Sequence, residues 1–120
     1  MNSIPTKGPK EQYTIDYVQS CIPVSIAQAG VYYQMTKLIA YNSTILQSDG
    51  VYLSIRELVT RFCISRNTLA QHILILQDLD YLRKIRCAHS HVIMLNPLNI
   101  WRGHIIGRSE AIKVYMDQVL

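Results

Sequence analysis

Two groups of polar and cationic side chains stand close together in the second half of the chain. The first group consists of Ser65, Arg66, Asn67, Thr68, Gln71 and His72. The second group consists of Arg83, Lys84, Arg86 and His89. Long cations neutralise phosphates, while amides, hydroxyls and imidazoles hydrogen-bond to base edges. These residue types at this spacing predict a surface that binds nucleic acid.

The first group lies on the second of two short helices that the apolar pattern predicts. Apolar residues recur at helical spacing on both sides of Cys63, at Leu58, Phe62, Ile64, Leu69, Ile73 and Leu76, so two helices can bury their stripes against each other. Ser54 and Ser65 stand where the helices should begin, and Glu57 completes a capping-box pattern with Ser54. The second helix, expected over residues 65–77, would turn its polar face toward a major groove.

The second group lies on a predicted β-hairpin. Two β-prone runs, residues 81–87 and 91–95, flank the small-residue turn Ala88-His89-Ser90. A hairpin that directly follows such a helix pair is a wing, so the whole unit would be a winged helix. The cations on its first strand and tip would lie against the phosphate backbone and supply affinity without sequence information. Residues 51–53 are expected to form a short strand that pairs with this hairpin.

Each assignment has a plainer alternative. The wing cations could be solvated charges on an exposed strand, and Thr68 could be a small residue near a helix start. A winged-helix domain could also bind another protein through its exposed helix or its wing. The clustering of Arg83, Lys84 and Arg86 with Arg66 favours DNA, because a protein-binding surface usually carries apolar or acidic residues in such places.

Metal and catalytic chemistry are weaker interpretations. Cys87, His89 and His91 alternate and could hold zinc from one face of a strand. The expected hairpin turn falls within this segment, and no second ligand pair has a suitable spacing, so neither a metal nor a cofactor is expected. The acidic residues are scattered around helix ends and turns, without a glycine-rich phosphate loop or a nucleophile elbow. We therefore expect no catalytic residue.

Composition limits the class of protein. The 120 residues are enough for one domain with its own core. Apolar residues make up 49% of the chain and charged residues only 17%, which favours a partner subunit that shares apolar surface. The net charge of +4 suits nucleic acid. The chain has neither a run of ~20 apolar residues nor a signal-peptide pattern, so a cytoplasmic protein with no membrane partner is expected. Its three cysteines have irregular spacing, which predicts reduced thiols.

The sequence divides into an arm, a domain and a C-terminal helix. Residues 1–12 contain two prolines and mixed charge without periodicity, which predicts a flexible arm. The winged-helix domain is expected over residues 13–103. It would include a strand within 13–21, a first helix from residue 24 or 25 to about 41, and Trp101 packed over the domain edge.

Residues 104–120 are expected to contain a final helix that begins near Ser109. Its apolar stripe consists of Ile112, Tyr115, Met116 and Val119. No later element of the sequence can cover this stripe, so a homodimer contact is one interpretation. The other interpretation is that the helix folds back onto its own domain.

The stretch from about Gly30 to Gly103 resembles winged-helix regulators. The matching residues are Ser54-Ile55-Arg56-Glu57-Leu58-Val59, Ile64-Ser65-Arg66-Asn67-Thr68-Leu69, Leu76 and Leu82. The chain also resembles RepL-type plasmid replication proteins, through Val92-Ile93-Met94-Leu95-Asn96-Pro97 and Ile100-Trp101-Arg102-Gly103. Cys63 and Asp80 depart from the pattern by standing where glycines are usual, so both bends are expected to be shaped differently.

The resemblance implies an α+β, mostly helical fold: a winged helix-turn-helix with a two-stranded wing and a C-terminal helix. It also implies sequence-specific binding of double-stranded DNA. The protein would then act as a replication initiator of a plasmid or phage, or as a transcriptional regulator.

Overall fold

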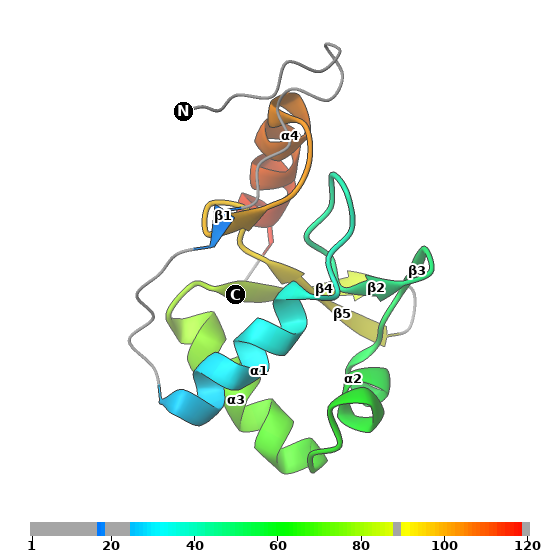
Figure 1. Cartoon of the computed structure of the whole chain (residues 1–120), viewed down its shortest axis with the longest axis vertical. Helices are drawn as coiled ribbons and strands as arrows, with labels where there is room; N and C mark the ends of the chain where they lie inside the picture. The colour runs from blue at the N-terminus through cyan, green and yellow to red at the C-terminus, as the bar shows by residue number, and fades with distance from the viewer. Residues whose placement is uncertain (1–16, 19–24, 88–89, 119–120) are drawn as a thin grey trace, which may run out of the picture.

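The computed structural model describes residues 17–18, 25–87 and 90–118. Over these ranges the chain is α+β, with four helices and three two-stranded antiparallel sheets. In chain order the elements are β1 (Tyr17–Val18), α1 (Ile26–Thr36), β2 (Gln47–Ser48), β3 (Val51–Tyr52), α2 (Ile55–Phe62), α3 (Arg66–Asp78), β4 (Leu82–Cys87), β5 (Ser90–Leu95), β6 (Ile100–Trp101) and α4 (Ile105–Met116) (Figure 1). The predicted arm, His89 and Val119 lie outside the described residues. None of the described helices has the length and apolar character needed to cross a membrane.

The predicted helix pair is confirmed at α2 and α3, and its caps explain both starts. Ser54 Oγ accepts a hydrogen bond from the Glu57 amide, and Glu57 Oε1 accepts one from the Ser54 amide at 2.8 Å, so the capping box is complete. Ser65 Oγ accepts from the Thr68 amide at the start of α3. The observed helix from Arg66 to Asp78 differs by one residue at each end from the predicted 65–77.

Each bend that flanks α3 contains a left-handed residue other than glycine. Cys63, between α2 and α3, has φ 57°, and Asp80, between α3 and β4, has φ 61°. Glycine enters this region with the least strain. The expectation that these bends would differ in shape from glycine bends is therefore wrong. At Asp80 the carboxylate binds Tyr115 and Arg83, which offsets the strain.

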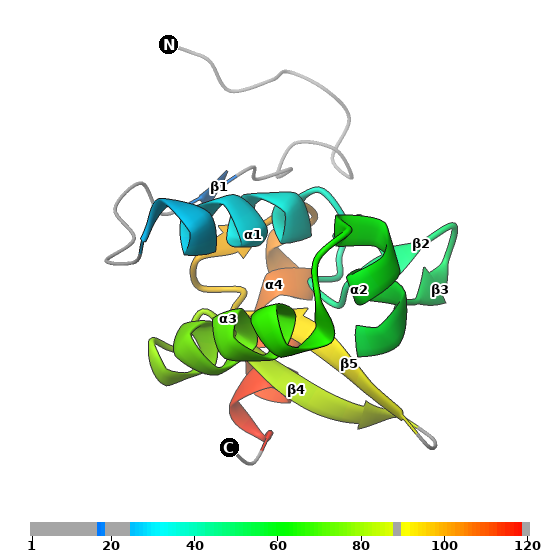
Figure 2. The same ribbon diagram turned by 90° about the horizontal axis from the view of Figure 1, so that it is seen from below.

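The core lies between α1, α2, α3 and the root of the β4–β5 hairpin. The predicted apolar stripes meet there, since Phe62 and Ile64 pack against a cluster of buried side chains. That cluster includes Tyr32, Met35, Leu58, Leu69, Ile73, Leu76, Leu82, Ile93 and Leu95. Figure 2 shows α1 alongside α3, with the hairpin running out from beneath α3. Burial of these side chains is the main favourable term for folding, and it fixes the hairpin's root against the helix pair.

Residues 51–53 do not pair with the hairpin as predicted. β2 and β3 pair with each other instead. Asp49 and Gly50 between them have φ 53° and 80°, and positive φ at both central residues is typical of the type I′ turn that closes two-residue hairpins. The chain contacts β5 one residue later, through an isolated bridge between Ser54 and Val92.

Three other expectations are wrong. α1 ends at Thr36, where the chain turns, rather than near residue 41. α4 begins at Ile105 rather than near 109, because a ring nitrogen of His104 accepts a hydrogen bond from the first turn. Trp101 is fully buried instead of covering a domain edge, and its indole N–H donates to the His104 carbonyl at 3.2 Å.

Asn96 joins the end of the hairpin to its beginning. Its side chain is buried, donates from Nδ2 to the Asp80 carbonyl and accepts the Leu98 amide, both at 2.9 Å. Its backbone amide donates to the Tyr81 carbonyl at 2.9 Å. Part of the Asn-Pro motif that carries the RepL resemblance therefore has a structural role in this chain.

Candidate nucleic-acid interface

The first two turns of α3 present a polar face to solvent. Asn67 and Gln71 are exposed, while Leu69 and Ile73 on the opposite side are buried; Arg66, at the first position of the helix, is also exposed. Helical spacing produces this separation, because residues three and four apart share a face. Asn67 and Gln71 are therefore free to meet a ligand at one face, and Arg66 is exposed at the start of the same helix.

Three other predicted contacts are already occupied or turned inward. Ser65 and Thr68 are exposed, but their hydroxyls bind each other at 2.8 Å as part of the helix cap. His72 is only half-buried, yet its Nδ1 is enclosed without a hydrogen-bond partner. Structural roles therefore account for Ser65 and Thr68, and His72 lies at the edge of the polar face.

Strand alternation decides which hairpin residues share the side of the helix pair. In β4, Leu82, Lys84 and Arg86 point to one face, since side chains alternate along a strand. Their partners in β5 are Leu95, Ile93 and His91, and paired residues share a face. Leu82, Leu95 and Ile93 belong to the core beneath the helices. Lys84, Arg86 and His91 continue that face beyond the core and are exposed.

Arg83 belongs to the other face of the hairpin, which corrects its predicted role in phosphate binding. Its Nη1 donates to the backbone oxygens of Tyr115 at 3.0 Å and Gln118 at 3.3 Å, and its Nε donates to Asp80 at 3.3 Å. Its side chain is only 11% exposed. The guanidinium is therefore committed to contacts within the chain.

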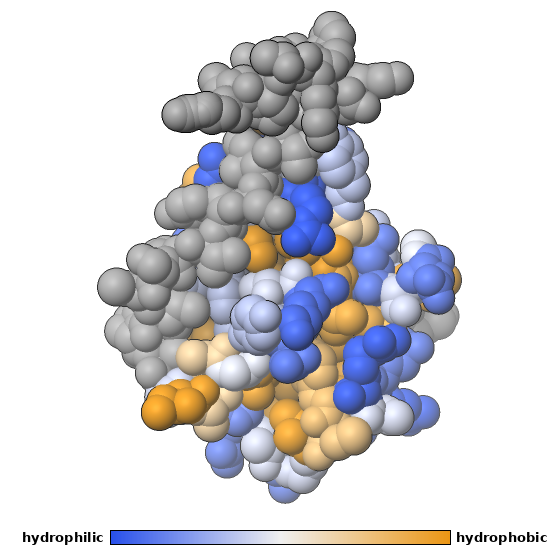
Figure 3. All heavy atoms as spheres, viewed as in Figure 1, coloured by the Kyte–Doolittle hydropathy of each residue, from blue (hydrophilic) through white to orange (hydrophobic). Residues whose placement is uncertain are grey.

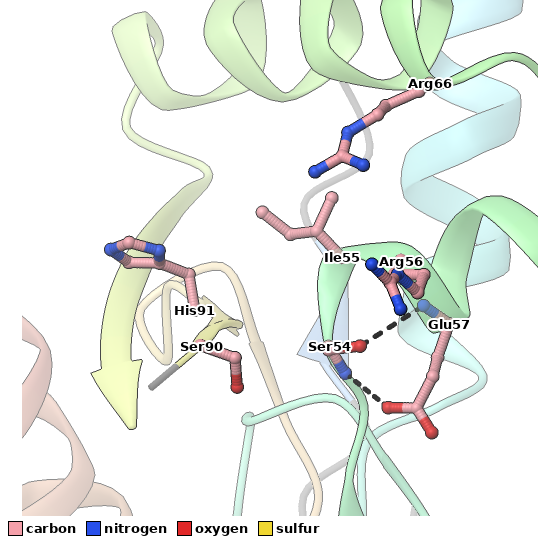
Figure 4. Close-up of a pocket in the computed structure, with 7 residues that line it drawn as sticks. All are labelled: Ser54, Ile55, Arg56, Glu57, Arg66, Ser90 and His91. Carbon is pink, nitrogen blue, oxygen red and sulfur yellow. Dashed lines mark hydrogen bonds between the residues drawn. The ribbon is translucent and has the colours of Figure 1, made fainter. Parts of the chain in front are cut away.

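An open hollow of about 570 Å³ lies between the start of α2, the start of α3 and the hairpin (Figure 4). Its lining residues are Ser54, Ile55, Arg56, Glu57, Arg66, Ser90 and His91. In the close-up, Arg66 extends from α3 toward α2, and His91 stands on the hairpin across the gap. Three elements thus contribute two guanidiniums, an imidazole and two hydroxyls to one concave surface.

One carboxylate also borders the hollow. The hydrogen bonds that Glu57 accepts from Ser54 lower the pKa of its carboxyl group. Glu57 therefore stays ionised as part of the α2 cap, and its charge partly offsets the neighbouring cations. Arg56 was not predicted as a member of this surface, although its place two residues after Ser54 puts it in the first turn of α2, where backbone N–H groups attract anions.

The predicted dimer stripe divides between two environments. Tyr115 is fully buried within its own domain, and its hydroxyl donates to Asp80 at 2.7 Å, so it is not available for a partner. Ile112 is half-buried and Met116 is 46% exposed. Other apolar side chains of α4 are exposed at Ile105, Ile106 and Val114. Figure 3 shows further apolar side chains at the surface over the lower half of its view.

The hairpin register removes the geometry that a zinc site would need. Cys87 pairs with Ser90, whereas His91 pairs with Arg86. Cys87 and His91 therefore point to opposite faces of the hairpin. Among the described residues, no group of three potential metal ligands comes together.

Comparisons with protein-family models, curated proteins and solved structures found no match to this chain.

Proposed function

We propose that this chain is a winged helix-turn-helix protein that binds double-stranded DNA at specific sequences. In this proposal α3 enters the major groove, and the wing, formed by β4 and β5, lies against neighbouring phosphates. One observation carries the proposal: the starts of α2 and α3 and one face of the wing border or continue a single open surface. Nucleic acid is a partner long enough to contact all three elements at once.

The polar residues of α3 have the chemistry needed to recognise bases. The major groove admits an α-helix, and the N-terminal residues of a recognition helix usually contact the base edges. Arg66 can donate two hydrogen bonds to guanine, and Asn67 or Gln71 can pair in the same way with adenine. These three side chains lie within the first two turns of α3, which supports sequence-specific binding.

Four cationic side chains beside this face suit the DNA backbone. Arg56 and Arg66 line the hollow, and Lys84 and Arg86 lie on the helix side of the wing. All four are exposed. Phosphate neutralisation releases condensed counterions and supplies most of the affinity that does not depend on sequence.

The biological role that we propose is replication initiation at a plasmid or phage origin, or transcriptional regulation. Both roles require the same recognition of a duplex site. The resemblance of residues 92–97 and 100–103 to RepL-type proteins supports the first role, and the generic winged-helix pattern supports the second. In either role the protein would work in the cytoplasm without a cofactor.

One observation favours the alternative, a winged-helix module that binds another protein. The outer face of α3 becomes apolar in its second half, where Leu74 is 58% exposed, and Leu79 after the helix is 39% exposed. Apolar side chains of this kind are common at the centres of protein interfaces. DNA and protein binding would use different halves of α3, so variants in each half separate them.

The first test concerns sequence recognition. Asn67→Ala or Gln71→Ala should cost ~1–3 kcal/mol of binding free energy on a duplex selected from a random pool, because the hydrogen bonds to a base edge are removed. Binding to a scrambled duplex should change little. Fluorescence anisotropy measures both, and Leu74→Ala is the matched control on the second half of the same helix. Equal losses on the two duplexes would contradict base recognition by α3.

The second test concerns the wing. Lys84→Ala combined with Arg86→Ala should weaken binding to every duplex and lower the slope of log affinity against log salt by about 0.9 for each phosphate that is no longer neutralised. Lys113→Ala, which removes an exposed cation from α4, should leave the slope unchanged. If the wing variant keeps the wild-type slope, the wing is not part of the interface.

We further propose that the protein acts as a symmetric homodimer joined through α4, with help from α1 and the N-terminal strand. The support is the apolar side chains that α4 leaves exposed, Met116 among them. Two-fold symmetry would place two recognition helices about one duplex turn apart, which matches an inverted repeat and raises affinity.

The third test concerns this dimer. Ile112→Glu with Met116→Glu should convert the dimer to a monomer, because it places charges in an apolar contact, and should weaken binding to the inverted repeat far more than it changes helicity. Tyr115 is left intact because it belongs to the core. Sedimentation velocity measures the assembly. A variant that stays dimeric would place the interface elsewhere, and a wild-type monomer at micromolar concentration would refute the dimer.

A further inference from the structure

The end of α4 is tied to the first strand of the wing by one arginine. Arg83 Nη1 lies 3.0, 3.5 and 3.3 Å from the backbone oxygens of Tyr115, Met116 and Gln118. The last carbonyls of a helix have no hydrogen-bond donor within it and carry partial negative charge. A guanidinium there donates hydrogen bonds to them and also offsets that charge. The side chain thus holds β4 to the C-terminal end of α4, 32 or more residues further along the chain.

Two side chains complete this contact. The Tyr115 hydroxyl donates to Asp80 Oδ1 at 2.7 Å, and Arg83 Nε donates to the same oxygen at 3.3 Å. The guanidinium carbon of Arg83 lies 4.4 Å from the centre of the Tyr115 ring, a cation–π distance. Burial and the bond to Asp80 raise the pKa of Tyr115, so its hydroxyl remains a donor at physiological pH. We call Asp80, Arg83 and Tyr115 the clamp.

The clamp holds the bend from which the wing emerges. Asp80 is the left-handed residue between α3 and β4, and its carbonyl accepts the Asn96 side chain from the far end of β5. The recognition helix, both ends of the wing and α4 therefore meet at one residue.

The wing is a two-stranded sheet, a kind of structure that is marginally stable by itself. β5 is also held by hydrogen bonds between Leu46 and Ile93 and between Thr44 and Leu95, both at 2.9 Å, and by a bridge between Ser54 and Val92. β4, which carries Lys84 and Arg86, is the strand that the clamp contacts. Arg86, Cys87, Ser90 and His91 near its tip are all exposed. Lys84 and Arg86 must nevertheless be held at a set angle to α3 if the wing contacts phosphate while α3 lies in the groove. The contacts of β5 and the clamp on β4 together supply that angle.

We infer that the clamp is a positioning device, through which α4 holds the wing in the orientation that lets Lys84 and Arg86 bind the DNA backbone. Arg83 and Tyr115 then contribute to DNA binding without touching DNA. The inference rests on the proposed function, and it deepens that function by making α4 a regulator of the wing. A partner subunit that packs on α4 would act on DNA affinity by the same route.

Tyr115→Phe tests the clamp without changing any charge. It removes the hydroxyl that binds Asp80 and keeps the aromatic ring beneath Arg83. Tyr33→Phe is the matched control, because it removes a hydroxyl from an exposed tyrosine of α1. Arg83→Lys is the second variant, since it keeps the positive charge but not the planar fork that binds Asp80 through Nε and the α4 carbonyls through Nη1.

Hydrogen exchange and DNA binding are measured on the same full-length proteins. In Tyr115→Phe and Arg83→Lys, amides of β4 and β5 should exchange about tenfold faster or more, while amides of α2 and α3 keep their wild-type protection. The affinity for duplex DNA should fall and the salt slope should decrease. Adding Lys84→Ala and Arg86→Ala to Tyr115→Phe should then cost less than in the wild type, because the wing already binds phosphate more weakly.

Three results would overturn the inference. In the first, amide exchange in β4 and β5 of the variants matches the wild type. In the second, exchange accelerates equally in all elements, which shows a merely structural role. In the third, exchange in β4 and β5 accelerates while DNA affinity and salt slope stay unchanged. A wild-type protein without measurable DNA affinity overturns the proposed function, and with it the DNA-binding role of the clamp. In that case the exchange rates still decide whether the clamp orders the wing.

Discussion

The pairing of Leu82 with Leu95 at the root of the β4–β5 hairpin is the constraint on which the rest of the surface depends. Both side chains are fully buried beneath α3 and α2, so one face of the hairpin must point toward the helices. Side chains alternate along a strand, and a slip of one residue would exchange the two faces. With this register Lys84 and Arg86 extend the surface of the helix pair, while Arg83 points toward α4. The hydrophobic core thus determines which cations can serve a ligand and which serve the fold.

In the helix pair too, some polar side chains form structural hydrogen bonds and others are left exposed to a ligand. Ser54, Glu57, Ser65 and Thr68 form the caps that start α2 and α3, and each cap fixes a first turn whose backbone N–H groups face outward. Arg56 and Arg66, one in each of these turns, are left exposed beside the hollow. The side chains that cap the N-terminal ends of α2 and α3 therefore also fix where Arg56 and Arg66 leave the backbone.

The elements governed by local rules could be predicted from the sequence, and those governed by distant contacts could not. The serine caps and apolar spacing predicted α2 and α3, and β-prone runs around a small-residue turn predicted β4 and β5. The pairing of β2 with β3, in place of the predicted pairing of residues 51–53 with the β4–β5 hairpin, does have a local signal. Asp49-Gly50 is a strong signal for a two-residue hairpin. The role of Arg83 had no such signal. Its carbonyl partners at the end of α4 lie 32 to 35 residues away, and a cation in a basic strand looks the same whether it binds phosphate or caps a helix. Tyr115 fitted an apolar stripe equally well whether it faced a partner or Asp80.

We propose that α3 and the Lys84 face of the β4–β5 hairpin bind one duplex together. Amide and side-chain NMR spectra of the labelled protein, titrated with a duplex selected from a random pool, test it most directly. We expect the largest shifts on the side-chain amides of Asn67 and Gln71, on the first turn of α2, and on Lys84 and Arg86. Signals from exposed residues of α4 should move far less. Shifts confined to α4 or to the second half of α3, or the absence of any shift with excess duplex, would contradict the account.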